Sequence, residues 1–347
     1  MVIVMKSVAS QRDIDYVVRR AQSLGLKAHI SAQNGQTLIG VTGDIKGLDP
    51  KSLTGLRGVE QVRAMTRPFR LASREFKSER TVVTVRGREV GGDGIVIMAG
   101  PCSVETRDQI VRTAAGCAEA GATFFRGGAF KPRSSPYAFQ GLAEEGLALL
   151  AEARELTGMP IVTEVLSSEQ VPLVAQYADV LQIGTRNMQN YMLLHAAGET
   201  GMPVLLKRGM MSTVEEFLLS AEYILSHGNP NVLLCERGIR TFETYTRNSL
   251  DINVVPALKE LSHLPVIVDP SHATGKASLV KAVSKGAIAA GADGLIIEAH
   301  HDPERAWSDA FQTISIPRLA ELTDEVDAIA RAVGRAVVRE PLAQSTA

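Results

Sequence analysis

The stretch PVIVDPSHATGKASLVKAVSKGAIAAGADGLIIE, residues 265–298, decides the fold class. It has an apolar run at 265–269, an amphipathic stretch at 277–290 and a second apolar run at 294–298. Near-continuous apolar runs separated by a helix are typical of parallel strands that are covered on both faces. The stretch therefore predicts one strand–helix–strand unit of an α/β protein.

The same alternation extends from about residue 94 to the end of this stretch. The apolar runs lie at 95–99, 122–126, 160–164, 180–183, 203–207, 232–235, 265–269 and 294–298. The amphipathic stretches between them include 106–120, 142–156, 168–177, 214–226 and 277–290. Eight such units within about 230 residues predict a closed (β/α)₈ TIM barrel. A doubly wound open sheet is the alternative.

Every apolar run ends on a polar or charged residue. These strand-end residues are Cys102, Arg126, Glu164, Thr185 with Arg186, Lys207 with Arg208, Glu236 with Arg237, Asp269 with His272, and Glu298 with His300. In a barrel the carboxyl ends of all eight strands meet at one mouth, where active sites are built. One charged residue after a strand is usually only solvated, but the complete set indicates a functional site.

The first seventy residues have a different pattern. They predict strands at 2–5, 27–31, 37–42 and 59–65 and helices at 12–24 and 50–56, with a hairpin turn at Asn34-Gly35. Asn-Gly between extended segments is a strong hairpin signal. The order strand, helix, strand, strand, helix, strand predicts a small ferredoxin-like α+β domain.

We therefore divide the chain into four parts. Residues 1–70 form the ferredoxin-like domain, and 71–93 form a linker with a hairpin that closes the bottom of the barrel. Residues 94–338 form the catalytic barrel, and 339–347 form a tail.

Composition excludes several classes of protein. The chain has 37 Lys and Arg against 38 Asp and Glu, a net charge of −1, so neither nucleic acid nor an anionic membrane is expected as the main partner. No apolar run reaches the roughly 18–20 residues of a membrane span, and the first residues lack the basic region of a signal peptide. Three cysteines are too few for a disulfide scaffold, so a reduced, cytoplasmic protein is expected.

Four strand-end residues suit a metal ion. Cys102, His272, Glu298 and Asp309 offer one thiolate, one imidazole and two carboxylates. This set fits one borderline divalent ion, Mn²⁺, Fe²⁺, Co²⁺ or Zn²⁺. A single cysteine is more commonly a buried structural residue, but the position of Cys102 at the mouth favours a ligand. His300 and His301 follow Glu298 too closely to join it on one ion, and we treat them as structural.

Basic residues also gather at the expected mouth. They are Arg126, Lys131, Arg133, Arg186, Lys207, Arg208 and Arg237. Seven cations at one mouth in a chain without net positive charge predict an anionic ligand, since arginine binds phosphate and carboxylate bidentately and lysine acts as a point charge. Their number suggests two anionic groups, and the Ser134-Ser135 hydroxyls and the Thr185 amide could add donors. Basic side chains together with a Lewis-acid metal favour carbon–carbon bond formation or phosphoryl chemistry.

The motifs together resemble a known enzyme family. They are AGPCSVE at 99–105, KPRSSPYAFQG at 131–141, QIGTRNMQN at 182–190, LLKRGM at 205–210, LCERGIRTFE at 234–243, VDPSHATG at 268–275 and IIEAHHDPERAWSD at 296–309. The chain resembles the 3-deoxy-D-arabino-heptulosonate 7-phosphate (DAHP) synthases of the type I beta subfamily. Its first seventy residues resemble the ferredoxin-like regulatory extension of some members.

The resemblance implies a transferase that condenses phosphoenolpyruvate with erythrose 4-phosphate, the first step of the shikimate pathway. It implies that Cys102, His272, Glu298 and Asp309 bind the metal. The residues implied for phosphoenolpyruvate are Arg126, Lys131, Thr185, Arg186, Lys207 and Arg237. Those implied for erythrose 4-phosphate are Lys131, Pro132, Arg133, Ser134 and Asp269.

Lys131 is placed to act as a general acid toward the new alkoxide. Glu164 has two open interpretations, a residue that orients the attacking water or a structural partner for nearby arginines. Cys102 and His272 complete the residues expected at the reacting centre through the metal.

Two other functions compete with this one. The 3-deoxy-D-manno-octulosonate 8-phosphate synthases share the fold and the phosphoenolpyruvate site but use arabinose 5-phosphate. They have Lys-Ala-Asn-Arg-Ser where this chain has Lys131-Pro132-Arg133-Ser134, and the Pro132-Arg133 pair favours erythrose 4-phosphate. A non-catalytic metabolite sensor is disfavoured because the metal and anion sets are both intact.

The ferredoxin-like domain is either a stability module or a regulatory one. We expect feedback inhibition by tyrosine or phenylalanine, bound between paired N-terminal domains. His29 and Ser31 lie two residues apart and so on one face of a strand, where they could recognise a phenolic hydroxyl. Such pairing suggests a homo-oligomer, expected to be a homotetramer.

Overall fold

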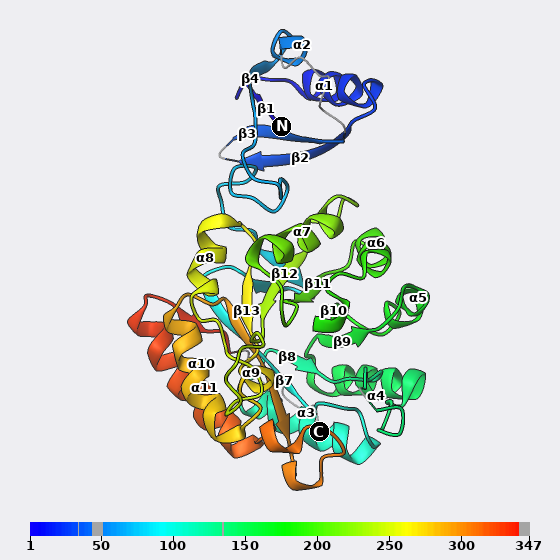
Figure 1. Cartoon of the computed structure of the whole chain (residues 1–347), viewed down its shortest axis with the longest axis vertical. Coiled ribbons are helices and arrows are strands. Elements are labelled where there is room, and N and C mark those ends of the chain that lie inside the picture. Colours follow the sequence, from blue (N-terminus) through cyan, green and yellow to red (C-terminus); the bar gives the residue numbers. More distant parts are fainter. Residues whose placement is uncertain (34, 44–50, 134, 340–347) are drawn as a thin grey trace.

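The computed structural model describes residues 1–33, 35–43, 51–133 and 135–339. They form a small α+β domain, drawn in blue, at one end of a larger α/β barrel (Figure 1). Among the described residues, no helix is both long and apolar enough to cross a membrane.

The N-terminal domain is a four-stranded antiparallel sheet with two helices. Its elements are β1 (Val2–Met5), α1 (Gln11–Ser23), β2 (Lys27–Gln33), β3 (Gln36–Thr42), α2 (Lys51–Thr54) and β4 (Val59–Arg63). The strand order β2-β3-β1-β4 is that of a ferredoxin-like domain, as predicted. Ser10 and Asp13 form a capping box that starts α1. Asn34, in the expected turn, lies outside the described residues.

The two faces of this sheet pack in different directions. Ile3 and Ile39 face the helices and share a core with Val17 of α1. On the opposite face, Val2, Val4 and Leu38 belong to the same buried cluster as linker residues Phe69, Leu71 and Phe76. A Cβ on Gly40 would lie 2.6 Å from Phe76, so glycine at this position lets the linker approach the sheet. The linker therefore joins the two domains through buried apolar contacts.

Eight parallel strands form a closed barrel, which confirms the predicted fold. They are β7 (Gly94–Gly100), β8 (Phe124–Arg126), β9 (Ile161–Val165), β10 (Val180–Ile183), β11 (Val204–Lys207), β12 (Val232–Glu236), β13 (Val266–Val268) and β14 (Gly294–His300). β14 pairs with β7 from Gly294↔Val96 to Glu298↔Gly100, which closes the sheet and excludes the doubly wound alternative.

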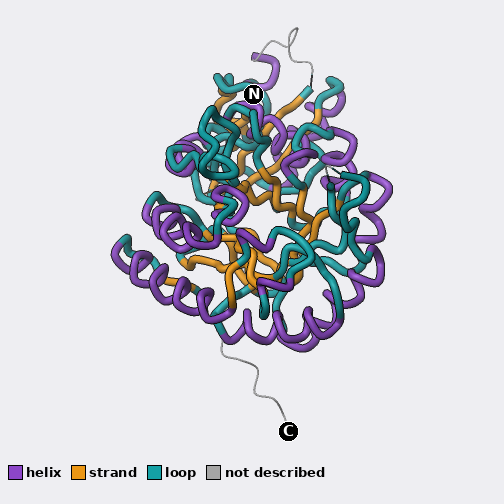
Figure 2. Tube along the Cα trace, turned by 60° about the horizontal axis from the view of Figure 1, so that its bottom comes forward, coloured by secondary structure: helices purple, strands orange, loops and turns teal. Residues whose placement is uncertain are grey.

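Helices surround these strands (Figure 2). They are α3 (Arg107–Glu119), α4 (Ala143–Thr157), α5 (Val171–Val174), α6 (Tyr191–Glu199), α7 (Val214–Leu225), α8 (Val254–Leu261), α9 (Pro270–Thr274), α10 (Ala277–Ala289) and α11 (Ile316–Ala332). The helix expected at 168–177 is much shorter, a 3₁₀ turn at Ser168–Gln170 followed by α5. The Asp179 amide already donates to the Ile161 carbonyl, so the chain enters β10 before the helix can continue.

The amino ends of the strands are covered by a hairpin, β5 (Val83–Val85) and β6 (Arg88–Val90). Val83, Val85 and Val90 are buried in one cluster with interior residues of the barrel such as Met98 and Phe124. The interior is therefore filled with side chains, and the space for ligands lies at the other end. Two short strands, β15 (Ile314–Ser315) and β16 (Ala336–Val337), pair with β14 and β7.

Candidate active site

A cavity of about 300 Å³ opens at the carboxyl ends of the strands. It is lined by Arg126, Lys131, Pro132, Arg133, Ser135, Ala138, Glu164, Gln182, Gly184, Thr185, Arg186, Lys207, Arg237, Arg247, His272 and Asp309. Strands far apart in the sequence thus bring their end residues to one mouth. Six of the seven basic residues expected there line the cavity.

Arg208 is the exception. It is buried, and its Nη1 atom donates to Glu236 and to Asp251, each at 3.0 Å. Arg208 therefore stabilises the loop after β12 and is absent from the cavity wall. Arg247 lines the cavity in its place. No sequence pattern predicted Arg247, which lies eleven residues beyond Glu236, the last residue of β12.

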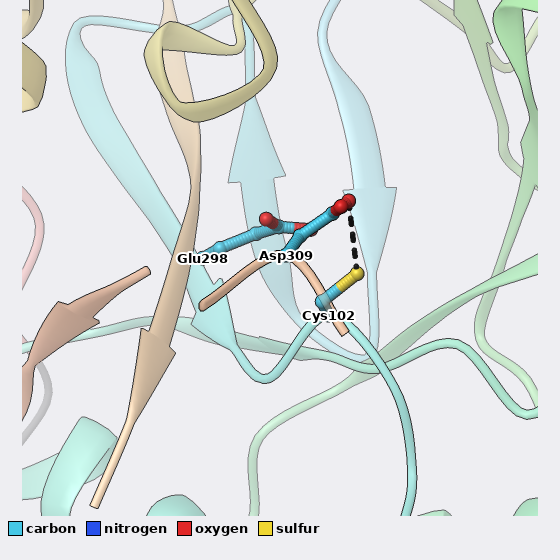
Figure 3. A group of neighbouring side chains, drawn as sticks. All are labelled: Cys102, Glu298 and Asp309. Carbon is cyan, nitrogen blue, oxygen red and sulfur yellow. Dashed lines mark hydrogen bonds between the residues drawn. The ribbon is translucent and has the colours of Figure 1, made fainter. Parts of the chain in front are cut away.

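Three potential metal ligands converge at the mouth (Figure 3). Cys102 follows β7, Glu298 lies on β14, and Asp309 precedes the 3₁₀ turn Ala310–Gln312. Their ligand atoms all lie within 4.8 Å of one another. The Sγ atom of Cys102 is 3.4 Å from Oδ2 of Asp309. Cys102 and Glu298 are buried and Asp309 is partly buried, so the cluster differs from acidic groups exposed on the surface.

His272 lies beside this cluster but is not among its three members. Its Nδ1 is 2.7 Å from Oδ2 of Asp269, and its Nε2 is 3.3 Å from Oε1 of Glu298. Oδ2 of Asp269 can thereby accept a hydrogen bond from Nδ1–H, which leaves the Nε2 lone pair available on the side of the cluster, as in metal-bound histidines. Burial lowers the pKa of His272, although Asp269 and Glu298 oppose this change. The neutral form that binds metals is therefore favoured.

The charge balance of the cluster suits a cation. Burial raises the pKa of the Cys102 thiol to about 12, and Glu298 adds to the effect. Burial also opposes ionisation of Glu298, but His272, Arg126 and Lys131 lower its pKa to about 2. One thiol, one neutral imidazole and two carboxylates form a set with the donor types preferred by Mn²⁺, Fe²⁺, Co²⁺ or Zn²⁺. The residues present therefore fit a divalent metal ion.

Several basic groups at the mouth have unused donors. Nη1 of Arg237 and Nε of Arg126 are buried and have no hydrogen-bond partner among the described residues. Buried donors without partners are costly, and an anionic ligand would satisfy them.

Lys131 donates to the Cys102 carbonyl at 2.7 Å and to its Sγ at 3.0 Å. Burial opposes the charge on Lys131, but Cys102 and Glu298 raise its pKa above the usual value.

The Glu164 side chain lines the cavity and lies close to the backbone of Gly184. Its Oε2 atom accepts a hydrogen bond from Gln182 at 3.3 Å. A Cβ on Gly184 would lie 1.9 Å from Oε1 of Glu164, so only glycine leaves room for the carboxylate. Among the described residues, no ion pair of Glu164 is found.

Comparison with known proteins agrees with this site. The DAHP synthetase I family matches residues 78–332, and the DAHP synthase ferredoxin-like domain matches residues 1–67. The chain belongs to the DAHP synthetase I family. It is thus a DAHP synthase, a transferase that condenses phosphoenolpyruvate with erythrose 4-phosphate.

A phospho-2-dehydro-3-deoxyheptonate aldolase from Thermotoga maritima is 48% identical over 334 residues, 96% of this chain and 99% of that protein. The crystal structure of the Thermotoga maritima DAHP synthase superposes with a TM-score of 0.78 and covers 97% of this chain and 99% of its own. A 2-dehydro-3-deoxyphosphooctonate aldolase from Syntrophobacter fumaroxidans is 31% identical over 267 residues, 72% of this chain and 92% of that protein. The likeness to the octulosonate enzymes is therefore the more distant one.

The residues expected at erythrose 4-phosphate lie in two places. Lys131, Pro132 and Arg133 line the cavity, and Ser134 lies outside the described residues. Asp269 is buried behind the wall, where it binds His272 and lies 2.5 Å from the Nζ atom of Lys207. Asp269 therefore contacts His272 and Lys207, and it does not itself line the cavity.

The expected effector residues lie at the opposite end of the barrel. His29 and Ser31 on β2 line one cleft with linker residues such as Phe76 and with His263 of the barrel. Nε2 of His29 is 3.1 Å from Oγ1 of Thr42. His263 precedes β13, so this cleft lies at the amino ends of the strands, away from the mouth.

Proposed function

We propose that this DAHP synthase holds one divalent metal ion, Mn²⁺, Fe²⁺, Co²⁺ or Zn²⁺, through Cys102, His272, Glu298 and Asp309. The observation that carries the proposal is the convergence of the thiol and two carboxylates within 4.8 Å, with Nε2 of His272 beside Glu298. When bound, such an ion supplies Lewis acidity toward a carbonyl oxygen.

Phosphoenolpyruvate is bound, in this proposal, by Arg126, Lys131, Thr185, Arg186, Lys207 and Arg237. All six line the cavity. The unpartnered nitrogens of Arg126 and Arg237 support the assignment, because a phosphate and a carboxylate together offer many acceptors. Nζ of Lys207 lies 2.5 Å from Oδ2 of Asp269, and this contact holds the side chain at the cavity wall.

Erythrose 4-phosphate is bound by Lys131, Pro132, Arg133 and Ser134, with Asp269 acting from behind the wall. Carbon 3 of phosphoenolpyruvate attacks the aldehyde carbon, and the aldehyde oxygen becomes an alkoxide. Lys131 donates a proton to it as general acid; its raised pKa means that it carries that proton at neutral pH. Glu164, held by Gln182, orients the water that adds at carbon 2 before phosphate leaves.

The N-terminal domain makes the enzyme sensitive to an aromatic amino acid, tyrosine or phenylalanine, and His29 and Ser31 recognise it. Support comes from the ferredoxin-like match over residues 1–67 and from the position of both side chains at one cleft. We further propose a homotetramer, since effector binding between paired N-terminal domains needs more than one copy.

The substrate assignment is tested by following phosphoenolpyruvate consumption with erythrose 4-phosphate and arabinose 5-phosphate in parallel. We expect turnover with the four-carbon sugar and little with the five-carbon one, because Pro132-Arg133 stands in the sugar-binding loop. The variants Arg133→Ala and Arg237→Ala separate the two sites: the first raises KM for the sugar phosphate, the second KM for phosphoenolpyruvate. Preference for arabinose 5-phosphate would contradict the assignment.

A further inference from the structure

A chain of hydrogen bonds joins the two carboxylates of the proposed metal site through Gln312 and Arg247. Nε2 of Gln312 donates to Oε2 of Glu298 at 2.6 Å. Oε1 of Gln312 accepts from Nη1 of Arg247 at 2.9 Å. The same Nη1 lies 3.4 Å from Oδ2 of Asp309. Neither Gln312 nor Arg247 is part of the ligand set proposed above.

The order of donors and acceptors in this chain leaves one arrangement of the Gln312 amide. Its NH₂ group faces a carboxylate, and its oxygen faces a guanidinium. The flipped amide would set oxygen against carboxylate and NH₂ against guanidinium, which have no bond to offer. Gln312 is buried, at 3% exposure, so water does not replace these partners. The amide is therefore locked between the two charged groups.

This lock determines which oxygen of Glu298 faces the other ligands. Gln312 occupies Oε2, while Oε1 lies 3.3 Å from Nε2 of His272. Nη1 of Arg126 also donates to Oε1 at 3.0 Å, so without Gln312 the carboxylate keeps this contact but loses the one that holds Oε2. Arg247 acts on the other carboxylate in addition, since its contact with Asp309 restrains that side chain at the cavity wall.

The backbone around Arg247 is tied to the helix that carries His272. The Arg247 amide donates to the Thr274 carbonyl at 3.0 Å, and Nδ2 of Asn248 donates to the His272 carbonyl at 2.9 Å. Gly275, with φ of +66°, lets the loop approach, because a Cβ there would lie 2.5 Å from Cβ of Arg247. The loop after β12 thus contacts the segments of two proposed ligands, His272 and Asp309.

We propose that Gln312 and Arg247 are positioning residues that preset Glu298 and Asp309 for the metal ion. The inference rests on the metal site proposed above. Residues that orient metal ligands typically contribute about 10- to 100-fold to metal affinity. Because the two residues share one hydrogen bond, removing both costs less than the product of the two single losses.

The test measures Co²⁺ binding to the chelator-treated, full-length chain by absorption, in the absence of both substrates. The variants are Gln312→Leu, Arg247→Met and the double variant. Arg154→Met is the matched control, because Arg154 is a partly buried, ion-paired arginine at the end of α4, bonded to Asp179 and the Tyr177 carbonyl. We expect each single variant to weaken Co²⁺ binding about 10- to 100-fold and to shift the d–d bands at saturation, whereas the control does neither.

The Co²⁺ titrations distinguish failure of the positioning role from failure of the proposed metal site. Affinity within twofold of wild type in both single variants, unshifted bands, or losses that multiply in the double variant would each overturn the inference. Absence of Co²⁺ binding by the wild-type chain would overturn the proposed metal site itself and the inference with it. The Arg247 side chain is 39% exposed, so Arg247→Met carries the test even if Gln312→Leu does not fold.

Discussion

At the scale of single residues, the mouth depends on groups held in unusual states by their neighbours. Cys102 is a buried thiol between Lys131 and Asp309. Nδ1 of His272 faces Oδ2 of Asp269 at 2.7 Å. Glu164 occupies space that only a glycine leaves open. Each of these states has a measurable consequence.

Metal affinity should rise with pH through Cys102. Burial raises the pKa of this thiol to about 12, so near neutral pH the free enzyme carries the proton and must release it when a cation binds. One released proton gives about a tenfold gain in affinity per pH unit. Titrating the chelator-treated enzyme with Co²⁺ at several pH values between about 6.5 and 8.5 measures this slope. Cys102→Ala should bind weakly and lose the slope; an unchanged slope in that variant would show that another group releases the proton.

Gly184→Ala should reduce kcat without unfolding the barrel. The new Cβ would lie 1.9 Å from Oε1 of Glu164 and must displace that carboxylate. Misplacing a reacting group by about 1 Å can cost on the order of 100-fold in rate. Gly286→Ala is the control, since nothing lies within 4 Å of its added Cβ. In a Glu164→Gln background the same change should cost little more; a full additional loss would mean that Gly184 acts by another route.

At the scale of elements, the sequence predicted the barrel well because each strand is an apolar run that ends on a polar residue. The helix expected at 168–177 was too long, since periodicity does not show where β10 must begin. Strand-end residues such as Arg126 and Arg237 do line the cavity at the mouth, where their positions after the strands predicted them. Arg247 lies in a loop, and loop geometry has no period that a sequence could reveal. Arg208 was expected at the cavity but does not line it. It pairs instead with Glu236 and Asp251, which only the folded chain brings next to it.

The linker docks on the barrel through His263, and this contact should depend on pH. Its Nδ1 is 2.7 Å from Oγ1 of Thr81, and its Nε2 is 2.7 Å from the Leu71 carbonyl. Burial lowers the pKa of His263 from 6.5 to about 4. The unfolded chain therefore binds a proton more readily, so stability is greatest above pH 6.5 and falls as the pH drops toward 4. The loss amounts to about 3 kcal/mol.

Urea unfolding at several pH values measures this loss. His263→Gln does not titrate, so the difference between wild type and variant should shrink as the pH falls. His227→Gln, just past the end of α7, is the control and should follow wild type. A constant difference between wild type and His263→Gln across this range would contradict the prediction.

At the scale of the whole molecule, the two functional regions lie at opposite ends of the barrel. The cavity is at the carboxyl ends of the strands, and the N-terminal domain packs at the amino ends through Leu71 and Phe76 (Figure 1). Within one chain the domain does not cover the mouth. The inhibition by an aromatic amino acid that we propose would therefore have to reach the mouth through the barrel or from a neighbouring copy.

Removing residues 1–70 should leave turnover and abolish inhibition by tyrosine or phenylalanine. The eight strands, the hairpin and the cavity all lie beyond this segment, whereas His29 and Ser31 are within it. Loss of Val2, Val4 and Leu38 exposes apolar linker residues, so a lower Tm is expected. Full-length His29→Ala with Ser31→Ala is the companion variant, because it keeps the domain but removes the proposed contacts. Unaltered inhibition of the truncated enzyme would refute the regulatory role.

We propose that the condensation of phosphoenolpyruvate with erythrose 4-phosphate depends on a metal ion held by Cys102, His272, Glu298 and Asp309. Its most direct test is phosphoenolpyruvate consumption by chelator-treated enzyme, before and after Mn²⁺, Fe²⁺, Co²⁺ or Zn²⁺ is restored. We expect no measurable consumption before, recovery after, and no recovery in Asp309→Ala. Full activity of the metal-free enzyme with erythrose 4-phosphate would show that the reaction does not need the metal ion.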